Sequence, residues 1–293
     1  MNYINSCGIL QLVLLFYCCG TILQFKKGGG IITIIDSHAH VVLPFAQQLD
    51  LMHEGGIDKT ILFSTTIHPE TATDLAAFEK EMATLDDILA GRKNPVQERI
   101  KSIEEVKQAI ARSPSSYIGF GSMPLGLSLQ ECMAWIEQHI LANRFYGIGE
   151  LAPGAGHMAE LEPIFAASAE LGPLPLWVHT FFPLTFADIQ QLLDLSAHYP
   201  SVPLILGHMG GVYWRQTLKV VKELPQVYLD LSATFTTIAP AIVAHELPAR
   251  TLFSSDAPYT SPVAARGLLE HAITDKAIRE RVFGLNIAEL LKL

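Results

Sequence analysis

Two histidines lie at the end of a short apolar run near the start of the sequence, and their spacing suits metal binding. Positions 31–35 are Ile and Thr, and Asp-Ser-His-Ala-His follows at positions 36–40. Because alternate residues of a strand point to the same side, His38 and His40 project together from the C-terminal end of this run. Two imidazoles on one rigid face form half of a metal site, and imidazole binds Zn, Fe, Ni and Cu.

Four later apolar runs also end in a side chain that can bind metal or transfer a proton. These side chains are Glu150, His179, His208 and Asp256. Core packing does not explain why five separate runs each place His, Asp or Glu at the C-terminal end. The sequence therefore predicts a metal site that is assembled from several strands.

Strand-like and helix-like segments alternate along the chain from residue 31 onward. Strands are predicted at residues 31–36, 59–65, 117–123, 146–150, 175–179, 203–208, 227–232 and 251–256. Helices are predicted at residues 128–144, 159–171, 185–199, 214–224, 240–247 and within 261–293.

This alternation is typical of a parallel α/β protein. Eight repeats of the unit predict a closed (β/α)8 TIM barrel over residues 31–293, close to the usual size of roughly 250 residues. Active sites of that fold lie at the C-terminal ends of the strands, where all the candidate ligands fall. An open doubly wound sheet is the alternative, but no glycine-rich phosphate loop follows the first strand.

The connection between the second and third predicted strands, residues 66–116, is longer than the others. It contains an acidic helical stretch at 74–89 and a second helix at 96–111. A long insertion after a barrel strand forms either a lid or an oligomer contact, and both interpretations stay open, including a homo-oligomer.

Together these residues resemble the amidohydrolase superfamily, and more narrowly the amidohydrolase-related (amidohydrolase 2-type) metal-dependent hydrolases with a TIM barrel. The resemblance covers about residues 31–293. It rests on Asp-Ser-His-Ala-His at 36–40, Gly-His-Met-Gly-Gly at 207–211, Ser-Ser-Asp-Ala-Pro at 254–258 and the helical segment 284–291.

The resemblance assigns a role to each matching residue. His38 and His40 match the pair that binds metal, and His179 matches a further ligand on the fifth strand. His208 matches a residue that binds a second metal in binuclear members and polarises the substrate in mononuclear ones. Asp256 matches a ligand that often acts as the general base.

Glu150 departs from the common pattern, in which many binuclear members place a carbamylated lysine on the fourth strand. TatD-type nucleases use a glutamate there, within Gly-Glu-x-Gly-Leu-Asp, whereas this chain has Gly-Glu-Leu-Ala-Pro at 149–153. Two roles stay open for Glu150: a bridge between two metal ions, or an acid/base group beside one.

The resemblance implies hydrolysis of an amide, ester or lactone bond in a small-molecule substrate by a metal-activated water. Decarboxylation of an aromatic or enol-type acid is the alternative, and a TatD-like nuclease is a further one. The implied cofactor is one or two divalent metal ions, with Zn expected and Mn, Fe and Co as alternatives. Catalytic roles are expected for Asp256, His208 and Glu150.

Several other residues fall close to these strand ends. Asp36 and Ser37 are expected to support the site by hydrogen bonds, and Asp230 either does so or is buried for structural reasons. Aromatic residues that could line a substrate pocket are Phe181, Trp214 and Tyr259. His68 and His157 are weaker candidates for substrate contact.

Charge and cysteine content limit the class of partner. The formal net charge is −9, and no run of Lys and Arg is present, so nucleic-acid binding is not expected. Three of the four cysteines precede residue 31, which argues against a disulfide scaffold and favours a cytoplasmic catalytic domain.

Residues 1–30 form an apolar N-terminal extension outside the predicted barrel. Residues 7–25 are mostly apolar and approach the roughly 20 residues that span a bilayer, so one interpretation is a membrane anchor. The other is a start codon assigned too early, because Lys-Lys-Gly-Gly-Gly at 26–30 resembles a translated ribosome-binding site.

Overall fold

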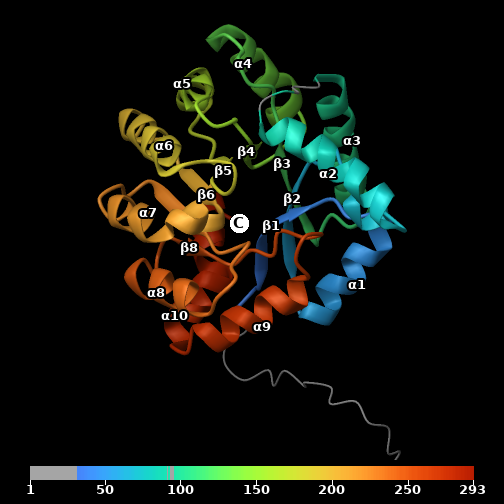
Figure 1. Cartoon of the computed structure of the whole chain (residues 1–293), viewed down its shortest axis with the longest axis vertical. Helices are drawn as coiled ribbons and strands as arrows, with labels where there is room; N and C mark the ends of the chain where they lie inside the picture. Colours follow the sequence, from blue (N-terminus) through green and yellow to red (C-terminus); the bar gives the residue numbers. More distant parts are fainter. Residues whose placement is uncertain (1–31, 91, 93–95) are drawn as a thin grey trace, which may run out of the picture. The chain divides into compact units, whose positions relative to one another are not determined.

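A sheet of eight parallel strands forms the centre of the protein. Figure 1 shows the computed structural model, which describes residues 32–90, 92 and 96–293. Each strand pairs with the next in chain order. The strands are β1 (Ile35–His40), β2 (Lys59–Phe63), β3 (Tyr117–Gly121), β4 (Gly147–Leu151), β5 (Leu176–His179), β6 (Leu204–Gly207), β7 (Val227–Asp230) and β8 (Thr251–Leu252).

The chain after β8 closes the sheet against β1. A parallel bridge joins Ala39 to Ala257, and the Ser37 amide donates to the Phe253 carbonyl at 2.9 Å. The Asp256 amide donates to the His38 carbonyl at 2.7 Å. The closed (β/α)8 TIM barrel is therefore confirmed, and the open doubly wound alternative is wrong.

Helices surround the barrel (Figure 1). They are α1 (Phe45–Gly55), α3 (Val96–Arg112), α4 (Leu129–Trp135), α5 (Glu162–Leu171), α6 (Phe186–His198), α7 (Trp214–Val221), α8 (Ile238–Glu246), α9 (Pro262–Ala272), α10 (Lys276–Glu280) and α11 (Asn286–Leu291). Capping boxes fix the N-termini of two predicted helices. Ser128 and Glu131 form the box of α4, and Thr185 and Asp188 form that of α6; in each, the side chains bond to backbone amides of the first turn. Helix α1 was not predicted.

Apolar side chains fill the barrel interior. Phe63, Phe120 and Trp177 are fully buried there, with ring centroids 5.1–6.0 Å apart. Ile287 and Leu291 of α11 pack against the same cluster and close the N-terminal end of the barrel. In the part of the chain that the structure describes, this leaves the opposite end, at the C-termini of the strands, open for a site.

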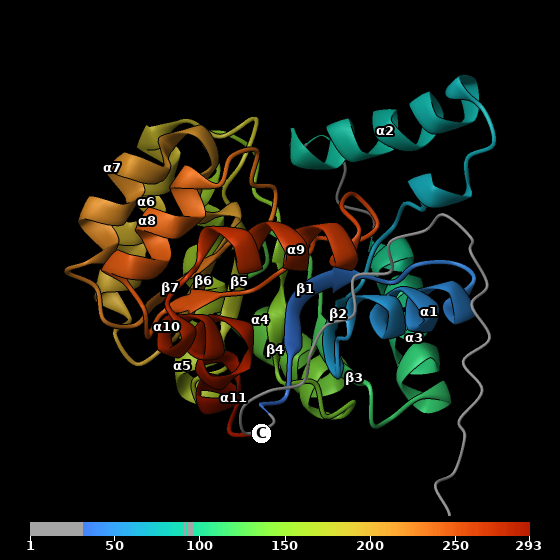
Figure 2. The ribbon, with the colours of Figure 1, turned by 90° about the horizontal axis from the view of Figure 1, so that it is seen from below.

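Helix α2 (Leu75–Leu89) lies beyond the C-terminal ends of the strands, away from the ring of helices (Figure 2). None of its residues is fully buried, so it is a poorly anchored element. Its side-chain cap is Asp74, which accepts a hydrogen bond from the Ala77 amide at 2.8 Å. The two helices predicted in residues 66–116 are confirmed as α2 and α3.

His68 connects α2 to the body of the barrel. Its ring lies 3.1 Å from a carboxylate oxygen of Glu70 through Nδ1 and 3.1 Å from one of Glu105, on α3, through Nε2. Its backbone amide donates to Glu81 of α2 at 3.0 Å. His68 was predicted as a substrate contact, but its ring nitrogens are occupied by carboxylates instead.

We expect this connection to weaken as pH rises. Burial alone would lower the pKa of His68, but the hydrogen bonds and charges of Glu70 and Glu105 outweigh it and raise that pKa. The protonated form is therefore favoured when α2 is docked. The stabilisation is present below the ordinary histidine pKa and is lost as pH rises through the raised value.

Protection factors from amide hydrogen exchange should show that the docking of α2 loses stability between pH 6 and pH 9. A partly exposed ion pair contributes about 1 kcal/mol, so protection should fall roughly fivefold. His68→Gln should show low protection at both pH values. Equal protection of the unmodified protein at both would mean that His68 does not hold α2.

Among the described residues, no helix combines the length and the apolar character that a bilayer span requires. The predicted anchor at 7–25 and the alternative start lie in residues 1–30, outside the part of the chain that the structure describes.

Candidate metal centre

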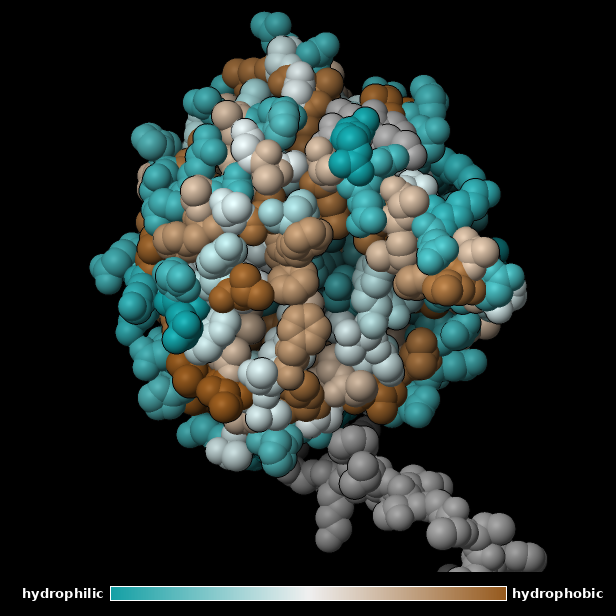
Figure 3. All heavy atoms as spheres, in the orientation of Figure 1, coloured by the Kyte–Doolittle hydropathy of each residue, from teal (hydrophilic) through white to brown (hydrophobic). Residues whose placement is uncertain are grey.

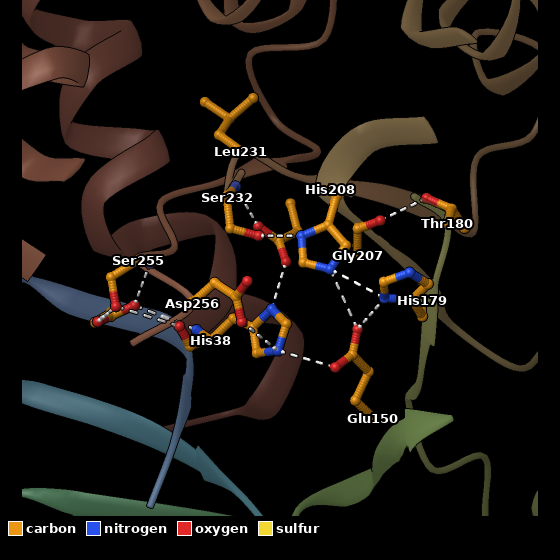
Figure 4. Close-up of polar contacts among 12 residues, drawn as sticks. His38, Glu150, His179, Thr180, Gly207, His208, Leu231, Ser232, Ser255 and Asp256 are labelled. Atoms are coloured by element: carbon orange, nitrogen blue, oxygen red, sulfur yellow. Dashed lines mark hydrogen bonds and ion pairs between the residues drawn. The ribbon is translucent and has the colours of Figure 1, made fainter. Parts of the chain in front are cut away.

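Six side chains that were predicted as ligands meet at the C-terminal end of the barrel. Figure 4 shows five of them, His38, Glu150, His179, His208 and Asp256. Each side chain belongs to the C-terminal part of a strand or to the loop that directly follows the strand. They are His38, His40, Glu150, His179, His208 and Asp256. The first strand is shifted relative to its prediction: β1 runs to residue 40 because its C-terminal half pairs with residues 253–257 as well as with β2.

The Glu150 carboxylate lies between His38 and His40 on one side and His179 and His208 on the other, and Figure 4 shows it with His38, His179 and His208. One oxygen, Oε2, is 3.6 Å from His38 Nε2 and 3.5 Å from His40 Nε2. The other oxygen, Oε1, is 3.1 Å from His179 Nδ1 and 3.4 Å from His208 Nε2. Each oxygen therefore faces its own set of ring nitrogens, which is the arrangement that a bridging carboxylate requires.

Asp256 completes the first of these two sets. Its Oδ1 atom is 3.4 Å from His40 Nε2 and 3.8 Å from His38 Nε2. The first set is thus His38, His40 and Asp256 with one oxygen of Glu150, and the second is His179 and His208 with the other.

The first set fits a divalent metal ion. Donor atoms at about 2.1 Å from one tetrahedral ion lie about 3.4 Å from one another, close to the separations found here. His38 Nε2 and His40 Nδ1 are buried, and neither has a hydrogen-bond partner in the described part of the chain. A buried imidazole nitrogen without a partner is costly, and for His38 Nε2 a bound ion would satisfy it.

Charges within the cluster keep the carboxylate ionised. Burial alone would raise the pKa of Glu150, but the charge of His38 and hydrogen bonds from His179 and His208 outweigh it and hold that pKa well below its usual range. Burial would likewise lower the pKa of His38, but Glu150 and Asp230 raise it instead. The ionised carboxylate is the form that binds metal, and a metal would displace the proton from the ring.

Asp230 orients His38. It is fully buried, and its Oδ2 atom lies 2.8 Å from His38 Nδ1, while its Oδ1 accepts a hydrogen bond from the Ser232 amide at 2.6 Å. A carboxylate on Nδ1 fixes the ring so that Nε2 faces the cluster. Of the two roles considered for Asp230, support of the site is the one that the contacts favour.

Asp36 supports the cluster in a different way. Its carboxylate accepts hydrogen bonds from the Ser255 amide at 2.9 Å and the Ser255 hydroxyl at 2.6 Å, which ties β1 to the segment that presents Asp256. Burial raises the pKa of Asp36 to about 7. Ser37 contributes through its backbone amide, which donates to the Phe253 carbonyl, and not through its buried hydroxyl, which has no hydrogen-bond partner among the described residues.

Two of the six candidate ligands have a left-handed backbone conformation. His208 has a φ of 66° and Asp256 a φ of 59°. Such a conformation costs roughly 1–2 kcal/mol in a residue with a Cβ, and it persists where neighbouring structure imposes it. Gly210 lies two residues after His208, and a Cβ there would meet Thr217 at 2.3 Å, so the turn at 207–211 requires glycine at this position.

A cavity of about 440 Å³ opens above the cluster. Its floor includes five of the six ligand candidates, and Figure 3 shows a hollow near the centre of this face with apolar residues beside it. Apolar walls come from α2 and from the loops after β5 and β7, and they include Met82, Leu85, Leu89, Phe181, Phe182 and Phe235.

Two of the three aromatic residues predicted to line the pocket do so, Phe181 and Tyr259, whereas Trp214 packs against the core. His157 does not line the cavity and instead contacts Glu160 on the surface. The contribution of α2 to the wall was not predicted. The spacing of Met82, Leu85 and Leu89 on an otherwise acidic helix is the signal that indicates it.

Comparison with known proteins gives a family and a set of similar folds. A family model described as amidohydrolase matches residues 35–293. No protein of curated function matches the sequence.

Three solved structures illustrate the similarity of fold. A 2,6-dihydroxybenzoate decarboxylase from Rhizobium is 16% identical, with a TM-score of 0.64 over 89% of this chain and 99% of that one. A dihydroxybenzoic acid decarboxylase from Polaromonas, solved with manganese and 2-nitroresorcinol, is 17% identical, with a TM-score of 0.66 over 90% and 98%. A 5-carboxyvanillate decarboxylase from Sphingomonas paucimobilis is 14% identical, with a TM-score of 0.65 over 90% and 100%.

Proposed function

The chain belongs to the amidohydrolase family, and from this premise we propose that it is a metal-dependent enzyme that acts on a small molecule in the cavity above His40, Glu150 and Asp256. The observation that supports a metal centre most directly is the Glu150 carboxylate, each of whose oxygens faces a separate pair of histidines. The cluster would hold two ions, one near His38, His40 and Asp256 and one near His179 and His208, with one oxygen of Glu150 toward each.

A two-ion centre favours hydrolysis of an amide, ester or lactone as the reaction. When bound, divalent ions supply Lewis acidity and lower the pKa of water toward about 7. Asp256, at the cavity floor, accepts the proton of the attacking water and returns it to the leaving group. Asp230 and Asp36 hold His38 and the Asp256 segment in place during the reaction.

Decarboxylation of an aromatic carboxylic acid is the second candidate, and the similar solved structures favour it over hydrolysis. The apolar and aromatic cavity walls suit such a substrate. One ion on His38, His40 and Asp256 would suffice, and His208, held by Ser232 at 2.8 Å, would then polarise the substrate. Zinc is the expected ion from the ligand types, and manganese, present in the Polaromonas relative, is the main alternative.

Metal content separates the two candidates. We expect two ions per chain in the unmodified protein, and one or none in Glu150→Ala and Glu150→Gln, because neither side chain can bridge as an anion. Glu137→Ala, on an exposed face of the barrel, is the matched control and should keep both ions. Elemental analysis of purified protein gives the count.

A single ion in the unmodified protein, unchanged in the Glu150 variants, would reject the bridge and leave decarboxylation as the better candidate. The reaction itself is then read from the product. Hydrolysis introduces oxygen from labelled water into the product, whereas decarboxylation of a hydroxybenzoate releases carbon dioxide.

A further inference from the structure

The cavity above the metal centre is larger than one aromatic ring requires. Its volume of about 440 Å³ compares with the roughly 150 Å³ that encloses a benzene molecule in a protein interior. The candidate metal ligands occupy only its floor. Among the described residues of its walls, the carboxylate and guanidinium groups are those of Asp86 and Arg99, one of each sign, so the walls have no net charge to bind.

A row of rings leads away from the floor of this cavity. The Phe181 ring lies 6.1 Å from the ring of His208 and 5.9 Å from the ring of Phe235, measured between centroids. Phe181 belongs to the loop after β5, and Phe235 to the loop after β7. Aromatic pairs attract each other at separations of about 4.5–7 Å, so the row forms one continuous aromatic surface.

The outer end of this row is open to solvent. Phe235 is 80% exposed, and Phe182, which also lines the cavity, is 74% exposed. Exposed apolar side chains that gather at a cavity are typical of a surface that binds a ligand. Met82 and Leu85 of α2 line the same cavity, so a group bound there would leave water on contact with both apolar surfaces.

We propose that the substrate carries, beyond the part that reacts, a second apolar group of at least the size of a phenyl ring, which binds along Phe181 and Phe235 and against α2. Phe235 then determines specificity for this group. The inference rests on the proposed function in placing the reacting part at the metal centre. It holds for hydrolysis and for decarboxylation, because either reaction takes place at the floor and leaves the second group unchanged.

Two carboxylates that differ by one ring test the inference without turnover. We expect the unmodified full-length protein to bind biphenyl-4-carboxylate at least tenfold more tightly than benzoate by calorimetry, because burial of a phenyl group changes affinity by roughly ten- to a hundredfold. Phe235→Ala should lower this ratio of affinities by about threefold or more, since it removes the outer ring of the row, and should leave benzoate binding unchanged. Phe235→Tyr, which keeps the ring, should keep the ratio.

Controls separate Phe235 from the metal and from misfolding. Tyr146→Ala removes an exposed aromatic side chain directly before β4, outside the cavity, and should leave the ratio unchanged. Because Phe235 is mostly exposed, Phe235→Ala should unfold at nearly the same temperature as the unmodified protein. Protein stripped of metal by a chelator should bind both carboxylates more weakly with the same ratio, so failure of the metal centre and failure of this inference give different results.

Equal binding of the two carboxylates would overturn the inference, and so would a ratio that survives in Phe235→Ala. A ratio that falls as much in Tyr146→Ala would mean that the second ring binds to apolar surface in general, which also overturns it. The other occupant of the exposed rings is a second copy of the chain. An oligomer of the unmodified protein that dissociates in Phe235→Ala, measured by light scattering, would assign the rings to that contact and overturn the inference.

Discussion

Asp256→Asn is expected to lower turnover by about 10²- to 10⁴-fold while most of the metal stays bound, because a positioned general base contributes rate enhancements of that size. The Asp256 carboxylate borders the cavity and lies 3.4 Å from His40 Nε2. The amide oxygen of asparagine can still act as a ligand in that place. It cannot accept the proton that the reaction releases, so chemistry is lost more than metal affinity.

The measurement is turnover and metal content on the same preparation. Asp275→Asn is a suitable control, since Asp275 caps α10 through hydrogen bonds that asparagine also makes, and it lies outside the cavity. Turnover that is unchanged in Asp256→Asn would remove Asp256 from proton transfer. A parallel loss of metal and activity would assign it a ligand role alone.

Much of the barrel follows from local sequence patterns. Each strand is a short apolar run bounded by turn residues, and such a run is a local signal. Local sequence determines less well where each strand ends, because the end depends on pairing with the neighbouring strand. Residues 253–256 were predicted as strand, yet β8 ends at Leu252, and the following residues bond to β1 instead through Ser37 and His38.

That the six candidate ligands lie together was predictable, because each follows a strand and the barrel brings the ends of its strands together. The hydrogen bonds that support these residues were harder to predict from the sequence. Asp230 meets His38 across 192 residues of sequence, and nothing in the surroundings of Asp230 distinguishes it from a carboxylate buried for structural reasons. Arg99 lies on α3, a mostly polar helix, and only the folded chain shows that it lines the cavity.

The place of α2 could not be predicted for a related reason. A helix with no fully buried residue contributes little to the core, so its sequence specifies the helix but not the surface that it covers. That surface is fixed by the contacts of the His68 ring with carboxylates, including Glu105, and by the hydrogen bond from the His68 backbone amide to the Glu81 carboxylate. In consequence the α2 side of the cavity wall is held by polar contacts, which are weaker and more sensitive to pH than the apolar packing of the barrel.

Removal of the metal is expected to abolish activity, and return of a divalent ion should restore it. Neither hydrolysis nor decarboxylation has a replacement for the charge that the ion supplies, since Arg99, the only lysine or arginine among the described cavity residues, lies in the wall rather than at the floor. Protein dialysed against a chelator should fall below about a thousandth of its initial turnover, which corresponds to a few kcal/mol of transition-state stabilisation. Titration with Zn²⁺, Mn²⁺ or Co²⁺ should recover it.

The concentration of ion needed for recovery tests the role assigned to Asp230. Asp230→Asn keeps the shape of the side chain but loses the charge that holds His38 Nδ1 at 2.8 Å. Loss of such a partner weakens metal binding by about 10- to 100-fold, so the variant should need that much more free metal while reaching a similar maximal rate. Asp194→Asn, on an outer helix, should titrate like the unmodified protein. Full activity after complete metal removal would contradict the metal-dependent mechanism, whereas an unchanged titration in Asp230→Asn would contradict only the support of His38 by Asp230.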